Sequence, residues 1–284
     1  MHRGRPLPER RRVRAGEPGT GVTGEFPVAS RPQAREPGSP GAISQGAPLT
    51  AVFPAQEPVE LVVFDCDGVL VDSEPIAVRT HVALGAELGW PLSESDVMHR
   101  FVGRSTTSIG EQIAERLGRE TARTWGERFQ EMHAVAVDES LTPVDGIVEA
   151  LDGLERAGLP PANWCVASSG SHQKMRHTLG KVGLYERFEG RIFSAHEVER
   201  GKPAPDLFLH AARRTGVDPS RCVVVEDSRF GVQAAAAAGM RSVGYAGGLT
   251  PAHWLTGLAT VVLTDMRLLP ALVTARRTAD ATGE

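Results

Sequence analysis

The feature that most constrains the fold of this chain is a run of four apolar residues, LVVF at 61–64, which ends directly in two aspartates. A short run rich in β-branched and aromatic residues is typical of a buried strand in a parallel sheet. Asp65 and Asp67 follow with one residue between them, and Gly68 comes next. Side chains two residues apart on a strand point the same way. We therefore expect both carboxylates to project from the carboxyl end of the strand, where open α/β sheets bind ligands.

A second pair of acids comes much later in the chain. Residues 221–225 (RCVVV) read as another buried strand, which ends in Glu226 and Asp227. Parallel strands bring such residues to one edge of the sheet, and acids that close raise one another's pKa values unless they share a cation. A hard divalent ion with oxygen ligands fits best. The sequence therefore predicts a Mg²⁺ site.

Two further segments offer groups that can bind a phosphate. Residues 163–167 read as a strand that ends in Ser168 and Ser169, with a helix behind them. Hydroxyls and free backbone N–H groups at the start of a helix favour an anion. In GKPAPD, residues 201–206, two prolines follow Lys202 and fix the backbone around it. A lysine held in this way is preorganised to stabilise charge on a phosphoryl group.

Other side chains of similar chemistry are expected to have no catalytic role. Lys174 and Arg176, in the helix after Ser168, are expected to be solvated. Three histidines of the segment 76–141 have no ligand-type partner at helical spacing, so we expect them to be surface or packing residues: His81, His99 and His133.

The hydrophobic period changes from strand to helix after residue 75 and stays helical up to Thr142-Pro143. No strand pattern interrupts this segment, which predicts a small all-α unit inserted into an α/β core. Its expected elements are helices over 76–88, 93–100, 107–117 and 120–137, with a loop at 101–105.

The first 57 residues differ from the rest in composition. Pro, Gly, Arg, Ser and Ala dominate, the net charge is +3 against −7 for the remainder, and no helical or strand period is present. Such a segment buries too little apolar surface to offset its chain entropy. We therefore predict a disordered extension at 1–57, an α/β core at 58–75 and 142–284, and the helical unit at 76–141, with fraying after Arg277.

Composition excludes several classes of function. A net charge of −4 gives no electrostatic basis for binding nucleic acid. No run of 18 apolar residues exists, so we expect no membrane span. Three scattered cysteines are too few for a disulfide framework or a zinc site, and we expect them to be buried apolar residues. We expect a cytoplasmic protein, a monomer or weak homo-oligomer, whose partner is a small molecule.

The four motif segments, in this order, resemble those of the haloacid dehalogenase-like (HAD) hydrolases. DCDGVLVDSE at 65–74 is similar to their first motif, Ser168 stands in the second, Lys202 in the third and Glu226-Asp227 in the fourth. The resemblance covers about 58–270 and is strongest to the sugar-phosphate phosphatases and beta-phosphoglucomutases. It implies a Rossmann-like core with a parallel sheet, and a helical cap domain over the active site.

The resemblance also implies a role for each residue. Asp65 would attack phosphorus and form an aspartyl-phosphate, and Asp67 would act as general acid and base. The remaining roles fall into three groups: Mg²⁺ ligands Asp65, Asp67, Glu226 and Asp227, phosphate-binding residues Ser168, Ser169 and Lys202, and substrate-facing cap residues Gly103 and Arg104.

The predicted function is a Mg²⁺-dependent phosphatase that hydrolyses a small organic phosphate monoester, with a sugar or sugar-acid phosphate in first place. Ser168-Ser169-Gly170-Ser171, with Lys174 and Arg176, is similar to that branch. One alternative is a beta-phosphoglucomutase, but Ala77 stands where mutases usually carry a histidine, which favours hydrolysis. A second alternative is a phosphoglycolate phosphatase. A receiver-type module would need neither Asp67 nor the helical insert.

Overall fold

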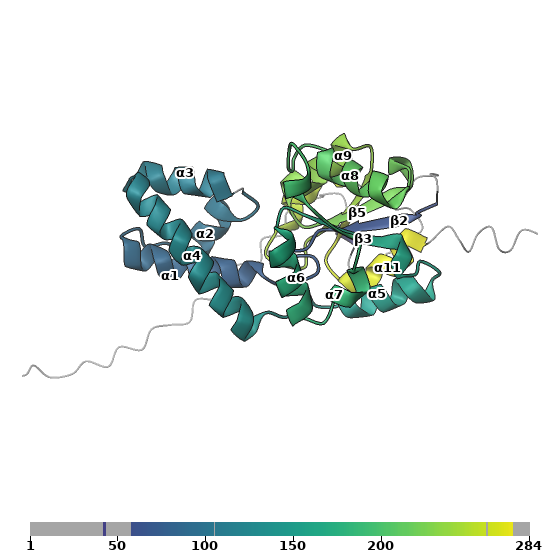
Figure 1. Cartoon of the computed structure of the whole chain (residues 1–284), viewed down its shortest axis with the longest axis horizontal. Coiled ribbons are helices and arrows are strands. Elements are labelled where there is room, and N and C mark those ends of the chain that lie inside the picture. Colours follow the sequence, from purple (N-terminus) through teal and green to yellow (C-terminus); the bar gives the residue numbers. More distant parts are fainter. Residues whose placement is uncertain (1–41, 44–57, 105, 260, 275–284) are drawn as a thin grey trace, which may run out of the picture. The chain divides into compact units, whose positions relative to one another are not determined.

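The protein is described by a computed structural model that covers residues 42–43, 58–104, 106–259 and 261–274. A parallel sheet organises this part of the chain (Figure 1). Its strand order is β1-β7-β6-β5-β2-β3-β4. The seven described strands are β1 (Ala42–Ile43), β2 (Leu61–Phe64), β3 (Trp164–Ser168), β4 (Ile192–Ser194), β5 (Cys222–Glu226), β6 (Arg241–Tyr245) and β7 (Val261–Leu263). The predicted α/β fold with a parallel sheet is confirmed.

The central position of β2 explains its apolar sequence. All four of its residues are buried, and it pairs with β3 on one side and β5 on the other. In the register, Phe64 lies opposite Val166 of β3 and Val225 of β5. The polar residues that follow these three strands therefore reach the same edge of the sheet.

Helices cover both faces of the sheet, and successive β2 residues face opposite layers. Phe64 packs in one hydrophobic cluster with Leu151, whereas Val63 packs in another with Ala211. One layer contains α5 (Ile147–Arg156), α6 (His172–Lys181), α7 (Tyr185–Phe188) and α11 (Leu269–Thr274). The opposite layer contains α8 (Asp206–Thr215) and α9 (Arg229–Ala237), with α10 (Ala252–Leu255) nearby (Figure 1). Short 3-10 helices join several elements: η2 (Pro161–Asn163), η3 (Ala195–Glu197), η4 (Pro219–Arg221) and η5 (Met266–Leu268).

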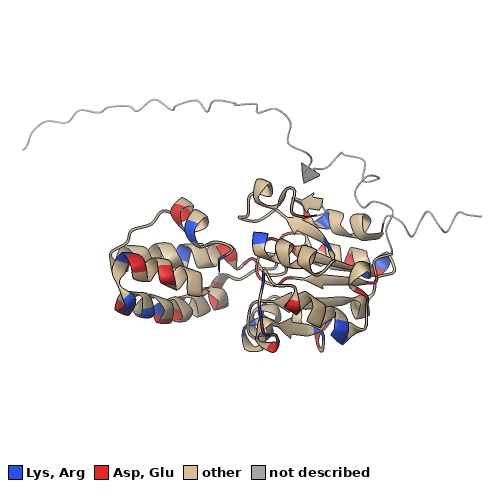
Figure 2. Ribbon diagram, turned by 90° about the horizontal axis from the view of Figure 1, so that it is seen from above, with Lys and Arg blue, Asp and Glu red and all other residues tan. Residues whose placement is uncertain are grey.

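The inserted segment folds as a helical block with its own apolar cluster. The cluster includes Leu84, Val97, Phe101 and Trp125, all nearly fully buried. The block comprises α1 (Glu74–Leu88), α2 (Glu94–Phe101), α3 (Thr106–Leu117) and α4 (Arg119–Ser140), and α4 packs on both α1 and α3. Figure 2 shows acidic and basic residues interspersed over this block. None of the described helices combines the length and apolar character needed to cross a bilayer.

Several boundaries were predicted correctly. Helix α1 ends at Gly89, which adopts φ 89°, and α2 is capped by Ser93, whose side chain accepts a hydrogen bond from the Asp96 backbone. Phe101, however, belongs to α2 and not to the expected loop, because its apolar ring is buried in the cluster. Helix α4 also runs on to Ser140, because no helix breaker precedes Pro143.

The prediction that 1–57 is disordered fails at one point. Ala42 and Ile43 form β1, which pairs in parallel with β7 at the edge of the sheet. The pairing depends on backbone hydrogen bonds to a strand more than 200 residues away, so no local period could indicate it. The rest of that segment, and the fraying expected after Arg277, lie outside the described residues.

Candidate active site

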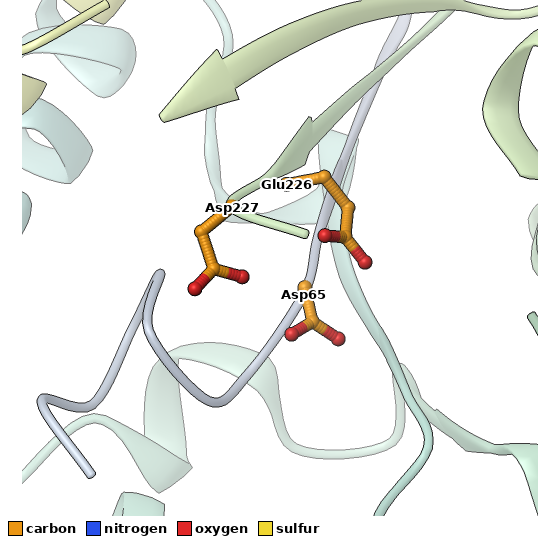
Figure 3. A group of neighbouring side chains, drawn as sticks. All are labelled: Asp65, Glu226 and Asp227. Carbon is orange, nitrogen blue, oxygen red and sulfur yellow. The ribbon is translucent and has the colours of Figure 1, made fainter. Parts of the chain in front are cut away.

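Three carboxylates meet at the carboxyl ends of the two central strands (Figure 3). Asp65 follows β2, Glu226 ends β5 and Asp227 comes next, and one oxygen of each lies within 4.8 Å of the others. All three side chains are buried. Burial raises the pKa of Asp65 to about 7 and that of Asp227 well above its usual value. An all-oxygen, buried and acidic group of this kind fits a hard divalent cation, which would remove the cost of their mutual repulsion.

Lys202 provides the positive charge of this cluster. Its Nζ donates hydrogen bonds to Asp65 Oδ1 at 2.6 Å and Glu226 Oε1 at 2.7 Å, and its side chain is only 6% exposed. The amine also lies 5.0 Å from the ring centroid of Phe208. Burial disfavours the charged amine, but the two carboxylates outweigh it and raise the pKa of Lys202. The lysine is therefore a fixed cation at the sheet edge.

Two glycines leave the space that these carboxylates occupy. Gly68 adopts φ +76°, and a Cβ built on it would overlap Oδ2 of Asp227. A Cβ on Gly231, in α9, would overlap Oε1 of Glu226. The backbone of the first motif and the helix after the fourth thus approach the acids as closely as a residue without a side chain permits.

Asp67 does not join the three carboxylates, contrary to the expectation that its side chain projects together with that of Asp65. The strand ends at Phe64, so Asp67 lies in the following turn, where strand alternation no longer holds. Its Oδ1 accepts a hydrogen bond from Ser73 Oγ and its Oδ2 one from Lys174 Nζ, both at 2.7 Å. Burial acts to raise the pKa of Asp67, but Lys174 and Ser73 outweigh it and lower the pKa.

Lys174 corrects a second expectation, because it is not simply solvated. It lies in the first turn of α6, and its side chain is 41% exposed while its amine contacts Asp67. Arg176, two residues later, lies with its guanidinium 5.1 Å from the ring centroid of Tyr185 and is exposed. The two aspartates of the first motif therefore each have a lysine of their own.

Glu74 is a further acid of the site that sequence reasoning did not single out. The first residue of α1, it shares a side-chain hydrogen bond with Asp227, and burial raises the pKa of Glu74 to about 7. Ser73, Glu74 and Lys174 could have been found from the sequence. The first two belong to the first motif, and Lys174 lies in the first turn of the helix that begins beside the predicted phosphate seat.

The serines of the second motif lie at the end of β3. Ser168 is 1% exposed and its Oγ accepts a hydrogen bond from the Gly170 backbone at 3.2 Å, whereas Ser169 is exposed. Ser171 caps α6 by accepting a hydrogen bond from the Lys174 backbone. The hydroxyl turn, the lysine and both acid pairs thus follow neighbouring strands of one sheet edge.

Gly103 and Arg104 lie in the helical block. Gly103 adopts φ +72°, and Arg104 is exposed. Both line a cavity of about 330 Å³ that is walled mainly by apolar side chains of the block and also by Glu74. They are not among the residues around the three carboxylates, and their substrate contact stays a prediction.

A larger cavity, of about 640 Å³, lies directly in front of Asp67. Its walls come from the start of α1, from α4 and from α6, and they include Ala77, Gln130, His133 and Lys174. The volume is in the range of about 300–1,000 Å³ that is usual for small-molecule sites. Asp67 therefore faces a space that can hold the organic part of a small substrate.

The sequence model of haloacid dehalogenase-like hydrolases matches residues 59–239, which include all four motif segments. The chain belongs to this family. It is similar to the 6-phosphogluconate phosphatase of Escherichia coli K12, with 34% identity over 64% of this chain and 80% of that protein. It is also similar to hexitol phosphatase A of the same organism, with 34% identity over 62% of this chain and 78% of that protein.

The fold of this HAD-like hydrolase is shared with solved structures. One, a conserved haloacid dehalogenase-like protein of unknown function from Agrobacterium tumefaciens, superposes with a TM-score of 0.68 at 35% identity. The match covers 77% of this chain and 99% of the other. The predictions of family, fold and an enzyme of the hydrolase class are confirmed.

Proposed function

We propose that this HAD-like hydrolase is a Mg²⁺-dependent phosphatase that acts on a small organic phosphate monoester through an aspartyl-phosphate. One observation carries the proposal. Asp65, Glu226 and Asp227 form a buried all-carboxylate group beside a buried lysine, at the sheet edge where Ser168 also lies. Such a group suits a divalent cation and a transferring phosphoryl group better than any neutral ligand.

In this proposal each side chain does one step. Asp65 attacks phosphorus, the ester bond to the leaving oxygen breaks, and Asp67 gives that oxygen a proton. Asp67 then takes a proton from the water that hydrolyses the aspartyl-phosphate. Lys202 and Ser168 hold the phosphoryl oxygens in line. Asp65, Glu226 and Asp227 would hold Mg²⁺, which neutralises charge on the phosphoryl group when bound.

The substrate class proposed is a sugar or sugar-acid phosphate. The relatives named above act, by their names, on phosphorylated sugar acids and hexitols. The cavity in front of Asp67 has room for such a leaving group, and its walls carry hydrogen-bonding side chains. We further propose that the helical block, 76–141, serves as a cap that contributes this wall. Ala77 lines the cavity without an acid–base group, which favours hydrolysis over a mutase.

A panel of phosphate esters with Mg²⁺ tests this function, with released phosphate as the measurement. The panel contains 6-phosphogluconate, glucitol 6-phosphate, fructose 1-phosphate and 2-phosphoglycolate. We expect turnover of at least one six-carbon ester at a kcat/KM well above that for 2-phosphoglycolate. A preference for 2-phosphoglycolate would contradict the proposed substrate class. Conversion of beta-glucose 1-phosphate to glucose 6-phosphate in the presence of a bisphosphate primer, without phosphate release, would identify a mutase.

A further inference from the structure

The two lysines of the site lie on different sides of the reaction. Lys202 is buried and contacts the nucleophile Asp65, on the phosphoryl side. Lys174 is 41% exposed and contacts Asp67, the acid that faces the leaving group. The phosphoryl group does not require a second lysine on the far side of Asp67. Its position calls for another ligand.

The cavity that Lys174 borders has a particular balance of charge. Of the described residues that line it, Lys174 is the only lysine or arginine, and His177 is paired with Asp138 at 2.8 Å. Gln130 and Gln173 add neutral hydrogen-bonding groups. The acids on the wall are Asp67 and Glu74, at the end where the phosphate would enter. The cavity therefore offers one permanent positive charge and several polar groups to the organic part of the substrate.

We propose that Lys174 binds a carboxylate on the leaving group, so that the preferred substrates are sugar-acid phosphates. The inference rests on the proposed phosphatase function and names its substrate class. An ammonium group has three N–H donors, and only one is needed for the bond to Asp67. The other two face the cavity side of a half-exposed, flexible side chain. A carboxylate there forms a charge-assisted hydrogen bond, which is roughly twice as strong as the neutral bond that a hydroxyl would form.

A matched pair of substrates isolates this contact. 6-Phosphogluconate and glucitol 6-phosphate have the same open carbon chain and the same phosphate position, and differ in carrying a carboxylate or a hydroxymethyl group at C1. The measured quantity is the ratio of their kcat/KM values. We expect the wild-type enzyme to prefer the acid. Lys174→Met is expected to lower this ratio by about 10-fold to 100-fold, mainly through KM for the acid, as the loss of a hydrogen bond to a charged group implies.

Controls separate recognition from other effects of the substitution. Lys174→Met also removes a partner of Asp67 and will slow both substrates, which is why the ratio decides. Lys181→Met, at the exposed end of the same helix, should leave the ratio unchanged. Lys174→Arg keeps the charge and should keep the preference for the acid. If the methionine variant does not fold, Lys174→Gln is measured in its place with the same expectation.

Three outcomes are distinguishable. A fall in the ratio for Lys174→Met but not for Lys181→Met supports the assignment. A wild-type enzyme that releases phosphate from p-nitrophenyl phosphate but does not prefer 6-phosphogluconate, or a ratio unchanged in Lys174→Met, overturns the role of Lys174 alone. A wild-type enzyme that releases no phosphate from any of these esters overturns the proposed function itself.

Discussion

Nζ of Lys202 lies 2.6 Å from Oδ1 of Asp65, although 137 positions separate the two residues in the chain. The same amine reaches Glu226, so one buried cation balances the nucleophile and an acid of the neighbouring strand. Burial raises the pKa of Asp65 to about 7 even though Lys202 acts to lower it. The carboxylate group is therefore short of positive charge, and a divalent ion would supply it.

Replacement of Asp65 by Asn should abolish turnover. The substitution removes the nucleophilic oxygen and nearly preserves the volume of the side chain. Phosphate release from the best substrate should fall below detection, while the far-ultraviolet circular dichroism stays that of the wild type. Activity of Asp65→Asn within about tenfold of the wild type would reject Asp65 as the nucleophile, since loss of a nucleophile costs far more than that.

Addition of Mg²⁺ should raise the Tm of the wild-type protein, because an ion that binds only the folded state stabilises it. The bound ion must displace protons from the carboxylates, and burial raises the pKa of Asp65 to about 7. The affinity for Mg²⁺ should therefore increase as the pH rises from 6 to 8. Asp227→Asn should remove most of the shift in Tm. A Tm that does not respond to Mg²⁺ at pH 8 would contradict a metal site formed by these acids.

Gly68→Ala should disable the site, with Gly89→Ala as a matched control. Both glycines have positive φ, so each alanine costs roughly 1–2 kcal/mol of backbone strain. Only at Gly68 does the new Cβ overlap Asp227, whereas nothing lies within 4 Å of a Cβ at Gly89. A displaced carboxylate can lower activity by about 100-fold. Equal kcat/KM values for the two variants would show that the tight space beside Asp227 is unimportant.

His81 should make the stability of the helical block depend on pH. It is 7% exposed, and its Nδ1 accepts a hydrogen bond from Trp125 Nε1 at 3.1 Å. Burial lowers the pKa of His81 to about 4 from its model value of 6.5. The unfolded chain then binds the extra proton between about pH 6.5 and 4, so stability falls as the pH falls through this window.

At pH 5 the loss from His81 amounts to at most about 2 kcal/mol. His81→Gln keeps an acceptor for Trp125 but does not titrate in this range. The urea midpoint, followed by tryptophan fluorescence, should therefore drop less between pH 7 and 5 in His81→Gln than in the wild type. The same drop in both proteins would mean that other groups cause the acid sensitivity.

The sequence by itself determined the parts of this protein that depend on local pattern. Apolar runs that end in Asp65, Ser168 and Glu226 specify strands whose polar ends share one edge, because parallel strands in one sheet have a common direction. Helix caps such as Ser93 and stops such as Gly89 were also readable, since they depend on the conformation of a few residues.

Only the tertiary structure decided which charges meet. The sequence gave no reason to pair Asp67 with Lys174, 107 positions away, or to separate Asp67 from the carboxylates around Asp65. These contacts depend on where the turn after β2 directs each side chain and on how α6 packs against the sheet. Packing of distant elements sets both, and no spacing along the chain encodes the result. The edge strand β1 was missed for the same reason, because its partner β7 lies at the other end of the sequence.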